Sequence, residues 1–216
     1  MTQPWLIGCE ESGTVRDALL ARGIPAVSCD LKPSRSAVGE HLQCDLIEAI
    51  KMRPWRGLIA FPDCTYLTCS AEWAYGDGPY HQAVKPRTLV GAERREARRE
   101  AVRFFTVLFE CGLPCIALEN PVGVIGDRTG YRPAQTIQPH EFGADASKRT
   151  CLWLVGLPLL QPTKLVAPRM VNGKPRWANQ TDGGQNRLSP GPNRARDRSV
   201  TYQGVADAMA DQWGQA

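Results

Sequence analysis

The sequence predicts an α/β fold with a doubly wound parallel sheet, and three observations lead to this fold class. Short apolar runs of strand length recur through the first half of the chain. Helix-like stretches separate these runs, and glycines such as Gly23 and Gly112 stand where the helical stretches end. Strands that alternate with helices in this way usually lie parallel, because a parallel connection needs a long crossover.

Local signals place each element in turn. Strands are expected at residues 5–9, 25–29, 58–61, 115–118, 136–138 and 151–155. Helices are expected at residues 13–21, 46–51, 92–111 and 202–213, with Ser12 capping the first of them. The third helix is densely charged in its first half and apolar in its second. Only the second half is therefore expected to lie under the sheet.

The length of 216 residues suits one domain with a small appendage. We expect a core over residues 1–160, a loop-rich basic segment over residues 161–199, and a C-terminal helix within residues 200–216 that packs back on the core. The basic segment carries eight lysines and arginines against two aspartates, which gives it a net charge of +6 in a chain of net charge +4. Such a segment is expected either to contact phosphate or to be a solvated loop.

Composition argues against several classes of protein. Apolar residues make up 43% and charged residues 22% of the chain, and no apolar run approaches the roughly 18 residues of a membrane span. The first residues show no basic stretch followed by an apolar one, so no secretory signal is expected. Several of the eight cysteines lie in strand-like runs, where small buried thiols are common. Reduced thiols and a cytoplasmic location are therefore expected.

Small and acidic residues follow the first strands and indicate a cofactor site. Residues 8–13 let the backbone approach a ligand at a helix N-terminus, but their two acids argue against a phosphate there. Asp30 lies where a carboxylate can bind the hydroxyl pair of a ribose, and Asp45 could meet an adenine amino group. Together they point to an adenosine with a positive charge and no phosphate, which describes S-adenosylmethionine. The predicted cofactor-binding residues are Cys9, Glu10, Glu11, Ser12, Gly13, Asp30, Leu31, Asp45 and Pro62.

Reactive groups are predicted in two further segments, Phe61-Pro62-Asp63-Cys64 and Leu118-Glu119-Asn120-Pro121, each of which ends a strand-like run. Open α/β sheets bind ligands at the carboxyl ends of their strands. Methylation of carbon 5 of a pyrimidine needs a thiolate that adds to carbon 6 and an acid that holds ring nitrogen 3. We therefore predict Cys64 as the nucleophile and Glu119 as the acid, whose hydrogen bond to the exocyclic amine selects cytosine over uracil.

Neighbouring residues are expected to support this pair. Asn120 and Pro121 would fix the Glu119 carboxyl, and Lys148 with Arg149 would lower the thiol pKa or bind a phosphate. The predicted catalytic residues are Cys64, Glu119, Asn120 and Arg149, and the predicted substrate-binding residues are Asp63, Pro121, Lys148 and Arg187.

Each of these residues also has an alternative interpretation. The glycines after the first strand could form only a tight turn, and Asp30 could cap a helix. Cys64 could be a structural thiol, with Cys69 as a rival nucleophile, and Glu119 could cap a surface loop. Zinc is a further alternative at Cys111 and Cys115, but the sequence offers no second ligand pair, so no metal is expected.

With these segments in this order, the chain resembles the DNA cytosine-5 methyltransferases, and more closely the short methylase-like proteins of phages and prophages. Residues 6–13 resemble the family's first cofactor motif, Phe61-Pro62-Asp63-Cys64 its Pro-Cys nucleophile loop, and Glu119-Asn120-Pro121 its Glu-Asn-Val motif. Further similarity lies at Asp30, Asp45, Gln138, Lys148-Arg149, Arg187-Leu188-Ser189-Pro190 and residues 201–206. The resemblance implies a Rossmann-like methyltransferase sheet, S-adenosylmethionine as cofactor, and a covalent cysteine adduct. For a phage-encoded chain it implies the host cytoplasm.

Three departures from the family pattern bear on the substrate. Asp63 separates Pro62 from Cys64, the first motif lacks its usual aromatic-x-Gly-x-Gly pattern, and the region that reads DNA sequence is reduced to the basic segment. Specific DNA interfaces bury roughly 1,000 Å² or more, so this segment is expected to contact phosphates rather than bases.

The expected substrate is cytosine in DNA. The alternatives are a free cytosine nucleotide such as deoxycytidine monophosphate, an RNA base, or no reaction at all in an inactive nucleic-acid-binding relative.

Overall fold

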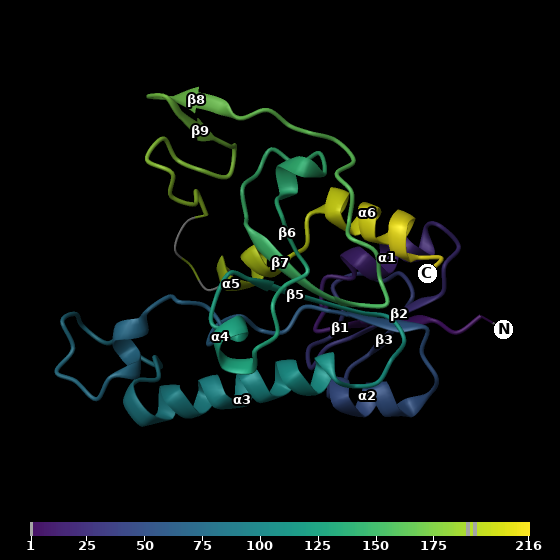
Figure 1. Ribbon diagram of the computed structural model, residues 1–216, viewed down its shortest axis with the longest axis horizontal. Helices are drawn as coiled ribbons and strands as arrows, with labels where there is room; N and C mark the ends of the chain where they lie inside the picture. Colours follow the sequence, from purple (N-terminus) through teal and green to yellow (C-terminus); the bar gives the residue numbers. More distant parts are fainter. Residues whose placement is uncertain (1, 189–190, 192–193) are drawn as a thin grey trace.

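A seven-stranded sheet forms the centre of the computed structural model, which describes residues 2–188, 191 and 194–216 (Figure 1). Across the sheet the strands are β3 (Glu40–Leu42), β2 (Ala26–Cys29), β1 (Trp5–Gly8), β4 (Gly57–Ala60), β5 (Ile116–Pro121), β7 (Thr150–Val155) and β6 (Gln135–Ile137). The strands β1 to β5 pair in parallel, whereas β7 pairs antiparallel with both β5 and β6. The α/β fold class is confirmed, with a mostly parallel sheet compatible with a Rossmann-like fold. The parallel arrangement expected from the first half of the chain holds from β1 to β5 but not at β7.

The reversal of β7 follows from the connection that precedes it. Between β6 and β7 there is only the 3-10 turn η2 (Pro139–Glu141), and parallel crossovers usually contain a helix. The reversal places the start of β7 beside the carboxyl end of β5, where Thr150 pairs with Pro121. Residues 147–149 therefore lie next to the segment that carries Glu119.

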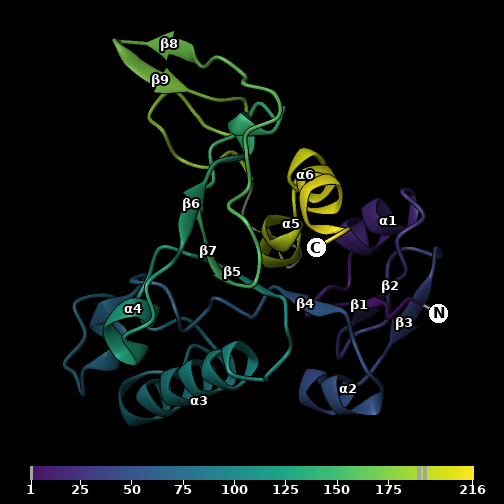
Figure 2. The ribbon, with the colours of Figure 1, turned by 45° about the vertical axis from the view of Figure 1, so that its right-hand side comes forward.

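Helices cover both faces of the sheet (Figures 1 and 2). One face carries α1 (Thr14–Leu20) and α6 (Gln203–Trp213), and the other carries α2 (Leu46–Met52), α3 (Gly91–Phe109) and α4 (Ile125–Thr129). Because successive strand residues point to opposite faces, Trp5 and Ile7 pack with the cluster of α1 and α6 while Leu6 packs with that of α2 and α3. Within the described part of the chain, no helix is long and apolar enough to cross a membrane.

The two halves of α3 pack differently. In the second half Phe105 is fully buried, and its ring lies edge-on to Trp153 with the centroids 5.1 Å apart. The expectation that this half lies under the sheet is confirmed. In the charged first half, however, Arg94 and Arg98 are also buried, which the sequence pattern does not predict.

The sequence pattern does not predict several short elements. The edge strand β3, the five-residue α4 and the 3-10 turn η1 (Glu72–Tyr75) are too short to show a hydrophobic period. The basic segment is not loop alone, because it holds the hairpin of β8 (Arg169–Val171) and β9 (Lys174–Arg176) and the helix α5 (Arg194–Ser199). Asn172-Gly173 is a hairpin turn signal, and both residues have the positive φ that a type I′ turn requires.

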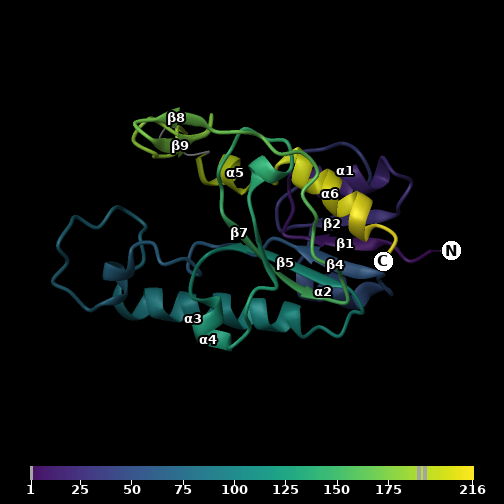
Figure 3. The ribbon, with the colours of Figure 1, turned by 45° about the horizontal axis from the view of Figure 1, so that its top comes forward.

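Two segments project at the same end of the molecule (Figures 1 and 3). One is the β8–β9 hairpin, and the other is the loop of residues 61–90 that joins β4 to α3 and contains η1. This second segment carries the predicted nucleophile, Cys64, near its start and is called the nucleophile loop below.

Candidate active site

Strand order reverses between β1 and β4, since the chain adds β2 and β3 on one side of β1 and then β4 and β5 on the other. Such a reversal leaves a crevice at the carboxyl ends of the strands, where open α/β sheets bind ligands. Hydrogen bonds hold the strand ends together: Phe61 N–H donates to the Gly8 carbonyl at 3.0 Å, and Glu10 N–H to the Cys29 carbonyl at 3.2 Å.

The charges of three aspartates act on Cys9 in this crevice. Burial raises the pKa of the Cys9 thiol, and the negative charges of Asp30, Asp45 and Asp63 raise it further. These aspartates come from the loops after β2, β3 and β4, so the structure brings together the acids predicted for the cofactor with one predicted for the substrate. Leu31 follows Asp30 and is 71% exposed.

Glu10 has a different role from the one predicted. It is buried, and its carboxylate accepts hydrogen bonds from the backbone N–H groups of Val15 at 2.6 Å and Arg16 at 3.3 Å. Burial raises the pKa of Glu10 to about 7 against the opposing effect of these bonds. Glu10 therefore caps two N–H groups of α1, while the Ser12 hydroxyl accepts only one N–H of the helix, that of Thr14 at 3.3 Å, from outside the N-cap position. Gly13 occupies the N-cap position with a φ of 78°, which favours glycine.

The other predicted cofactor acids also have protein partners. Glu11 forms ion pairs with Lys32 at 3.2 Å and Arg35 at 3.3 Å. One oxygen of Asp30 accepts the Lys32 N–H at 3.0 Å, and one oxygen of Asp45 accepts an N–H at 2.7 Å as the cap of α2. These acids hold the loops of the crevice in place, and Asp30 and Asp45 each do so through a single oxygen.

Asn120 joins the two predicted catalytic segments directly. Its side chain is fully buried, and its Nδ2 donates to the Pro62 carbonyl at 2.8 Å. The expectation that Asn120 fixes the Glu119 carboxyl differs from this contact, since the amide holds the backbone two residues before Cys64. The sequence thus predicts that the segments of Cys64 and Asn120 lie together, but it does not predict that Asn120 binds the Pro62 carbonyl.

A second junction lies further along the same two segments. Val124 N–H donates to the Leu67 carbonyl at 2.9 Å, and Thr68 forms an antiparallel bridge with Gly123. Gly123 is required by this close approach, because a Cβ atom there would lie 1.9 Å from the Leu67 carbonyl oxygen. The nucleophile loop is therefore joined to β5 before Cys64 and to the chain after β5 beyond Cys64.

The charges around Cys64 include those of the residues predicted to act with it. Burial raises the pKa of the Cys64 thiol, the negative charges of Asp63 and Glu119 raise it further, and the positive charge of Lys148 opposes them. Glu119 and Lys148 thus lie near enough to act on the thiol. Lys148 thus lowers the thiol pKa as expected, but burial and the two acids outweigh it, and the exposed Arg149 is not among the groups that act on the thiol.

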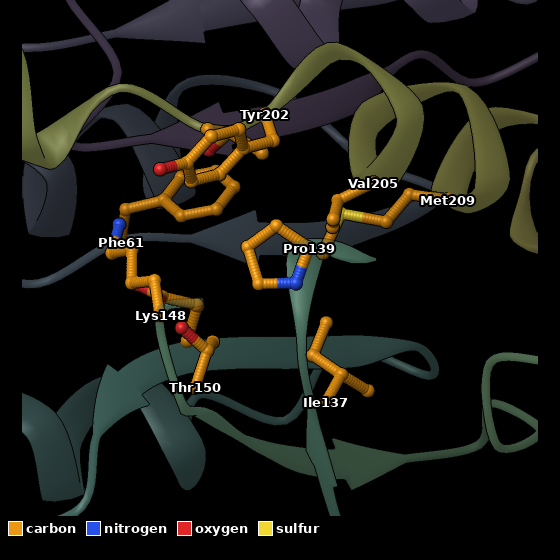
Figure 4. A pocket seen from close by; sticks show the side chains of 10 residues that line it. Phe61, Ile137, Pro139, Lys148, Thr150, Tyr202, Val205 and Met209 are labelled. Carbon is orange, nitrogen blue, oxygen red and sulfur yellow. The ribbon is translucent and has the colours of Figure 1, made fainter. Parts of the chain in front are cut away.

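Glu119 and Lys148 line a small pocket with about 320 Å³ of empty space, part of it open to solvent (Figure 4). Tyr202 at the start of α6 faces Thr150 across this pocket, and Phe61 lies at its side.

Among the described residues, no hydrogen bond to the half-buried Glu119 carboxyl is formed. This carboxyl is therefore available to a ligand. Thr201, Tyr202 and Val205 also line this pocket.

Lys148 is held in place from two sides. Gln138 accepts the Lys148 N–H through its Oε1 at 3.0 Å and so fixes the backbone at Lys148. The preceding residue, Ser147, is bracketed by Asn179, whose Oδ1 accepts the Ser147 N–H at 3.0 Å and whose Nδ2 donates to its carbonyl at 2.9 Å. Trp177 also stacks on His140, with the ring centroids 4.5 Å apart. The basic segment thus docks beside the pocket, a contact that its composition does not reveal.

Several arginines of the basic segment bind within the segment. Arg187 donates to the Gln180 carbonyl at 2.7 Å, Arg176 donates to the Asp182 carbonyl at 2.9 Å, and Arg169 forms an ion pair with Asp182 at 2.6 Å. Arginine–carbonyl bonds leave the positive charge and further N–H groups available to phosphate. Ser189 and Pro190, which belong to a segment similar to the family, lie outside the described residues.

The two candidate nucleophiles differ in exposure. Cys69, the rival nucleophile, is exposed, whereas Cys64 is half-buried. In the described ranges, His, Cys, Asp and Glu side chains form no group of three that could hold a metal ion.

Comparison with models of known protein families gives no match to this chain, and comparison with curated proteins gives none either.

Proposed function

We propose that the protein methylates carbon 5 of cytosine in DNA, with S-adenosylmethionine as the methyl donor and Cys64 as the covalent nucleophile. One observation carries the proposal: the charges of Glu119 and Lys148 both act on the Cys64 thiol, and two junctions bind the segments of Cys64 and Glu119 together. A thiol and a carboxyl in this arrangement can hold opposite edges of one flat ring. Thiolate addition to carbon 6 with an acid at nitrogen 3 is the chemistry that such a pair supplies.

The crevice between β1 and β4 suits the cofactor by its donor set. Asp30 retains an oxygen for the ribose hydroxyls, and the exposed Leu31 side chain offers an apolar surface to adenine. The carboxylates of Asp45 and Asp63 favour a ligand of positive charge. Glu10 has no part in this site, because its carboxylate is taken up by α1. When bound, S-adenosylmethionine supplies an electrophilic methyl group.

The raised pKa of Cys64 shapes the order of events. In the free protein the thiol keeps its proton, so deprotonation accompanies substrate binding. When Glu119 carries the proton that it shares with ring nitrogen 3, its negative charge no longer opposes the thiolate, and the charge of Lys148 then favours it. The thiolate adds to carbon 6, which makes carbon 5 nucleophilic. Carbon 5 would then take the methyl group from the sulfonium of S-adenosylmethionine as the S–CH3 bond breaks, leaving S-adenosylhomocysteine. A base then removes the carbon 5 proton, and the thiolate leaves as the double bond reforms.

The charge and the position of the basic segment support a polymeric substrate. The segment docks beside the pocket through Asn179 and Trp177, and its net charge is +6. A free cytosine nucleotide is the second candidate. It is favoured by the small size of the β8–β9 hairpin and by the neutralisation of Arg169 by Asp182, which leave little surface for base readout.

The decisive assay offers tritiated S-adenosylmethionine with duplex DNA, single-stranded DNA and deoxycytidine monophosphate in parallel. Label in DNA supports the proposal, and label in the mononucleotide alone replaces it with the second candidate. Cofactor binding without label in any substrate would reject methyl transfer.

The nucleophile is tested by a matched pair of variants. Cys64→Ala is expected to abolish transfer, by at least about 10³-fold, because no covalent adduct can form. Cys69→Ala is expected to keep wild-type activity, and both variants are expected to bind the cofactor as the wild type does. An active Cys64→Ala together with an inactive Cys69→Ala would assign the reaction to Cys69.

A further inference from the structure

Arg98 is a buried cation in the middle of a charged, largely exposed stretch of helix. Its side chain is 7% exposed, whereas that of Arg99, the next residue in α3, is 66% exposed. Burial of a charge is costly unless the charge is paired and hydrogen-bonded. The partners of Arg98 therefore identify what its burial achieves.

All of the partners of the Arg98 side chain lie in the nucleophile loop. Its Nε donates to the Tyr66 carbonyl at 2.9 Å, and its Nη2 donates to the Thr68 carbonyl at 3.1 Å. The guanidinium also forms an ion pair with Glu72 at 2.6 Å and lies 3.5 Å from the centre of the Tyr75 ring. One side chain of a rigid helix thus binds four residues within eleven positions of Cys64.

The two carbonyls flank the residue that joins the nucleophile loop to the chain after β5. Leu67 stands between Tyr66 and Thr68, and its own carbonyl accepts the Val124 N–H. Apart from the 3-10 turn η1, the loop has no helix or strand to hold this turn. A planar guanidinium with several N–H groups can bind two carbonyls and a carboxylate at once, and a lysine ammonium lacks that fork geometry.

We propose that Arg98 is a positioning residue for the reaction: it clamps the loop after Cys64 to α3 and so fixes the thiol relative to Glu119. The inference rests on the proposed function. Displacement of a reacting group by about 1 Å can cost roughly 10²-fold in rate. Loss of the clamp therefore acts on kcat, while the affinity for the substrate, which other residues bind, changes little.

The test compares Arg98→Lys and Arg98→Met with Arg99→Met, a control one residue away on the exposed face. For the Arg98 variants we expect kcat for cytosine methylation to fall roughly 10- to 100-fold with KM within about twofold. In the absence of substrate, iodoacetamide is expected to alkylate Cys64 several-fold faster than in the wild type, as the half-buried thiol becomes accessible. Arg99→Met is expected to match the wild type in both measurements.

Two results would overturn the role of Arg98: a folded Arg98→Lys with wild-type kcat and alkylation rate, or losses that appear equally in Arg99→Met. If Arg98→Met fails to fold, Glu72→Gln takes its place in the test. This variant weakens the ion pair with Arg98 at a half-exposed residue, so the same fall in kcat and rise in alkylation rate are expected, each smaller in size. A wild-type protein that methylates none of the substrates rejects the proposed function instead. The alkylation rate of Cys64 would still measure the clamp in that case.

Discussion

At the scale of single residues, the protonation of Cys64 is set mainly by burial and by two neighbouring acids. Asp63 can be tested without disturbing the turn that it forms. Its Oδ1 accepts the Thr65 N–H at 2.9 Å and the Thr65 hydroxyl at 2.6 Å, and an asparagine oxygen can accept both. Asp63→Asn is therefore expected to lower the pKa of the Cys64 thiol while it preserves the loop.

The measurement is the rate of Cys64 alkylation by iodoacetamide against pH. In the wild type the rate is expected to rise towards half its maximum only above about pH 9, where the thiolate forms. In Asp63→Asn the profile should move to lower pH. Asp77→Asn, which removes an exposed acid further along the loop, is the matched control. An unshifted profile in Asp63→Asn would show that the charge of Asp63 does not contribute to the thiol pKa.

Glu10 gives a second prediction at this scale, on stability. Its pKa is about 7 in the folded protein against an ordinary value of 4.5. The contribution of protonated Glu10 to stability is therefore complete below about pH 4.5 and is lost as pH rises through about 7. Relative to Glu10→Gln, the wild type should lose up to about 3 kcal/mol of unfolding free energy between these limits.

Urea unfolding at several pH values measures this difference, with Glu48→Gln, an exposed acid in the first turn of α2, as control. The glutamine retains one oxygen for the N–H groups of α1, so the cap is not lost altogether. If the wild type instead gains stability over Glu10→Gln as pH rises, the hydrogen bonds to the carboxylate outweigh its burial.

At the scale of elements, one junction of the site depends on a glycine. Gly123→Ala would place a Cβ atom 1.9 Å from the Leu67 carbonyl oxygen, and backbone on both sides must then move. We expect a loss of about 1–3 kcal/mol in stability and roughly 10²-fold in kcat, because the Cys64 and Glu119 segments separate. Gly183→Ala, where the nearest atom to a new Cβ is 3.9 Å away, is the control. Unchanged kcat in a folded Gly123→Ala would show that this junction does not position the thiol.

The elements also show how far the sequence could predict the fold and the site. Buried strands such as β1 and β4 appear as continuous apolar runs because both their faces are covered, and reactive residues follow such runs directly. The direction of β7 is decided by the absence of a crossover helix, which the sequence indicates only weakly. The role of Glu10 depends on the local turn geometry that aims its carboxylate at α1. The burial of Arg98 depends on a loop more than twenty residues away, so no local pattern contains it.

At the scale of the whole molecule, the positive charge is concentrated in one segment that docks beside the pocket, while the remainder of the chain has a net charge of −2. This distribution predicts binding to phosphates on one side of the site. It also distinguishes a polymer from a single nucleotide, because each neutralised phosphate contributes about −0.9 to the slope of log affinity against log salt for duplex DNA.

Lys174 on β9 is suited to measure this slope, since it is exposed and lies in the hairpin of the basic segment. For duplex DNA the wild type is expected to show a slope of roughly −3 or steeper, and Lys174→Gln should reduce it by about one while transfer to deoxycytidine monophosphate is unchanged. Lys51→Gln, an exposed lysine on α2, should leave the slope intact. A slope near −1 for DNA that neither variant alters would mean that only one phosphate is bound. The basic segment would then be a scaffold for the Lys148 loop, and the free nucleotide would become the favoured substrate.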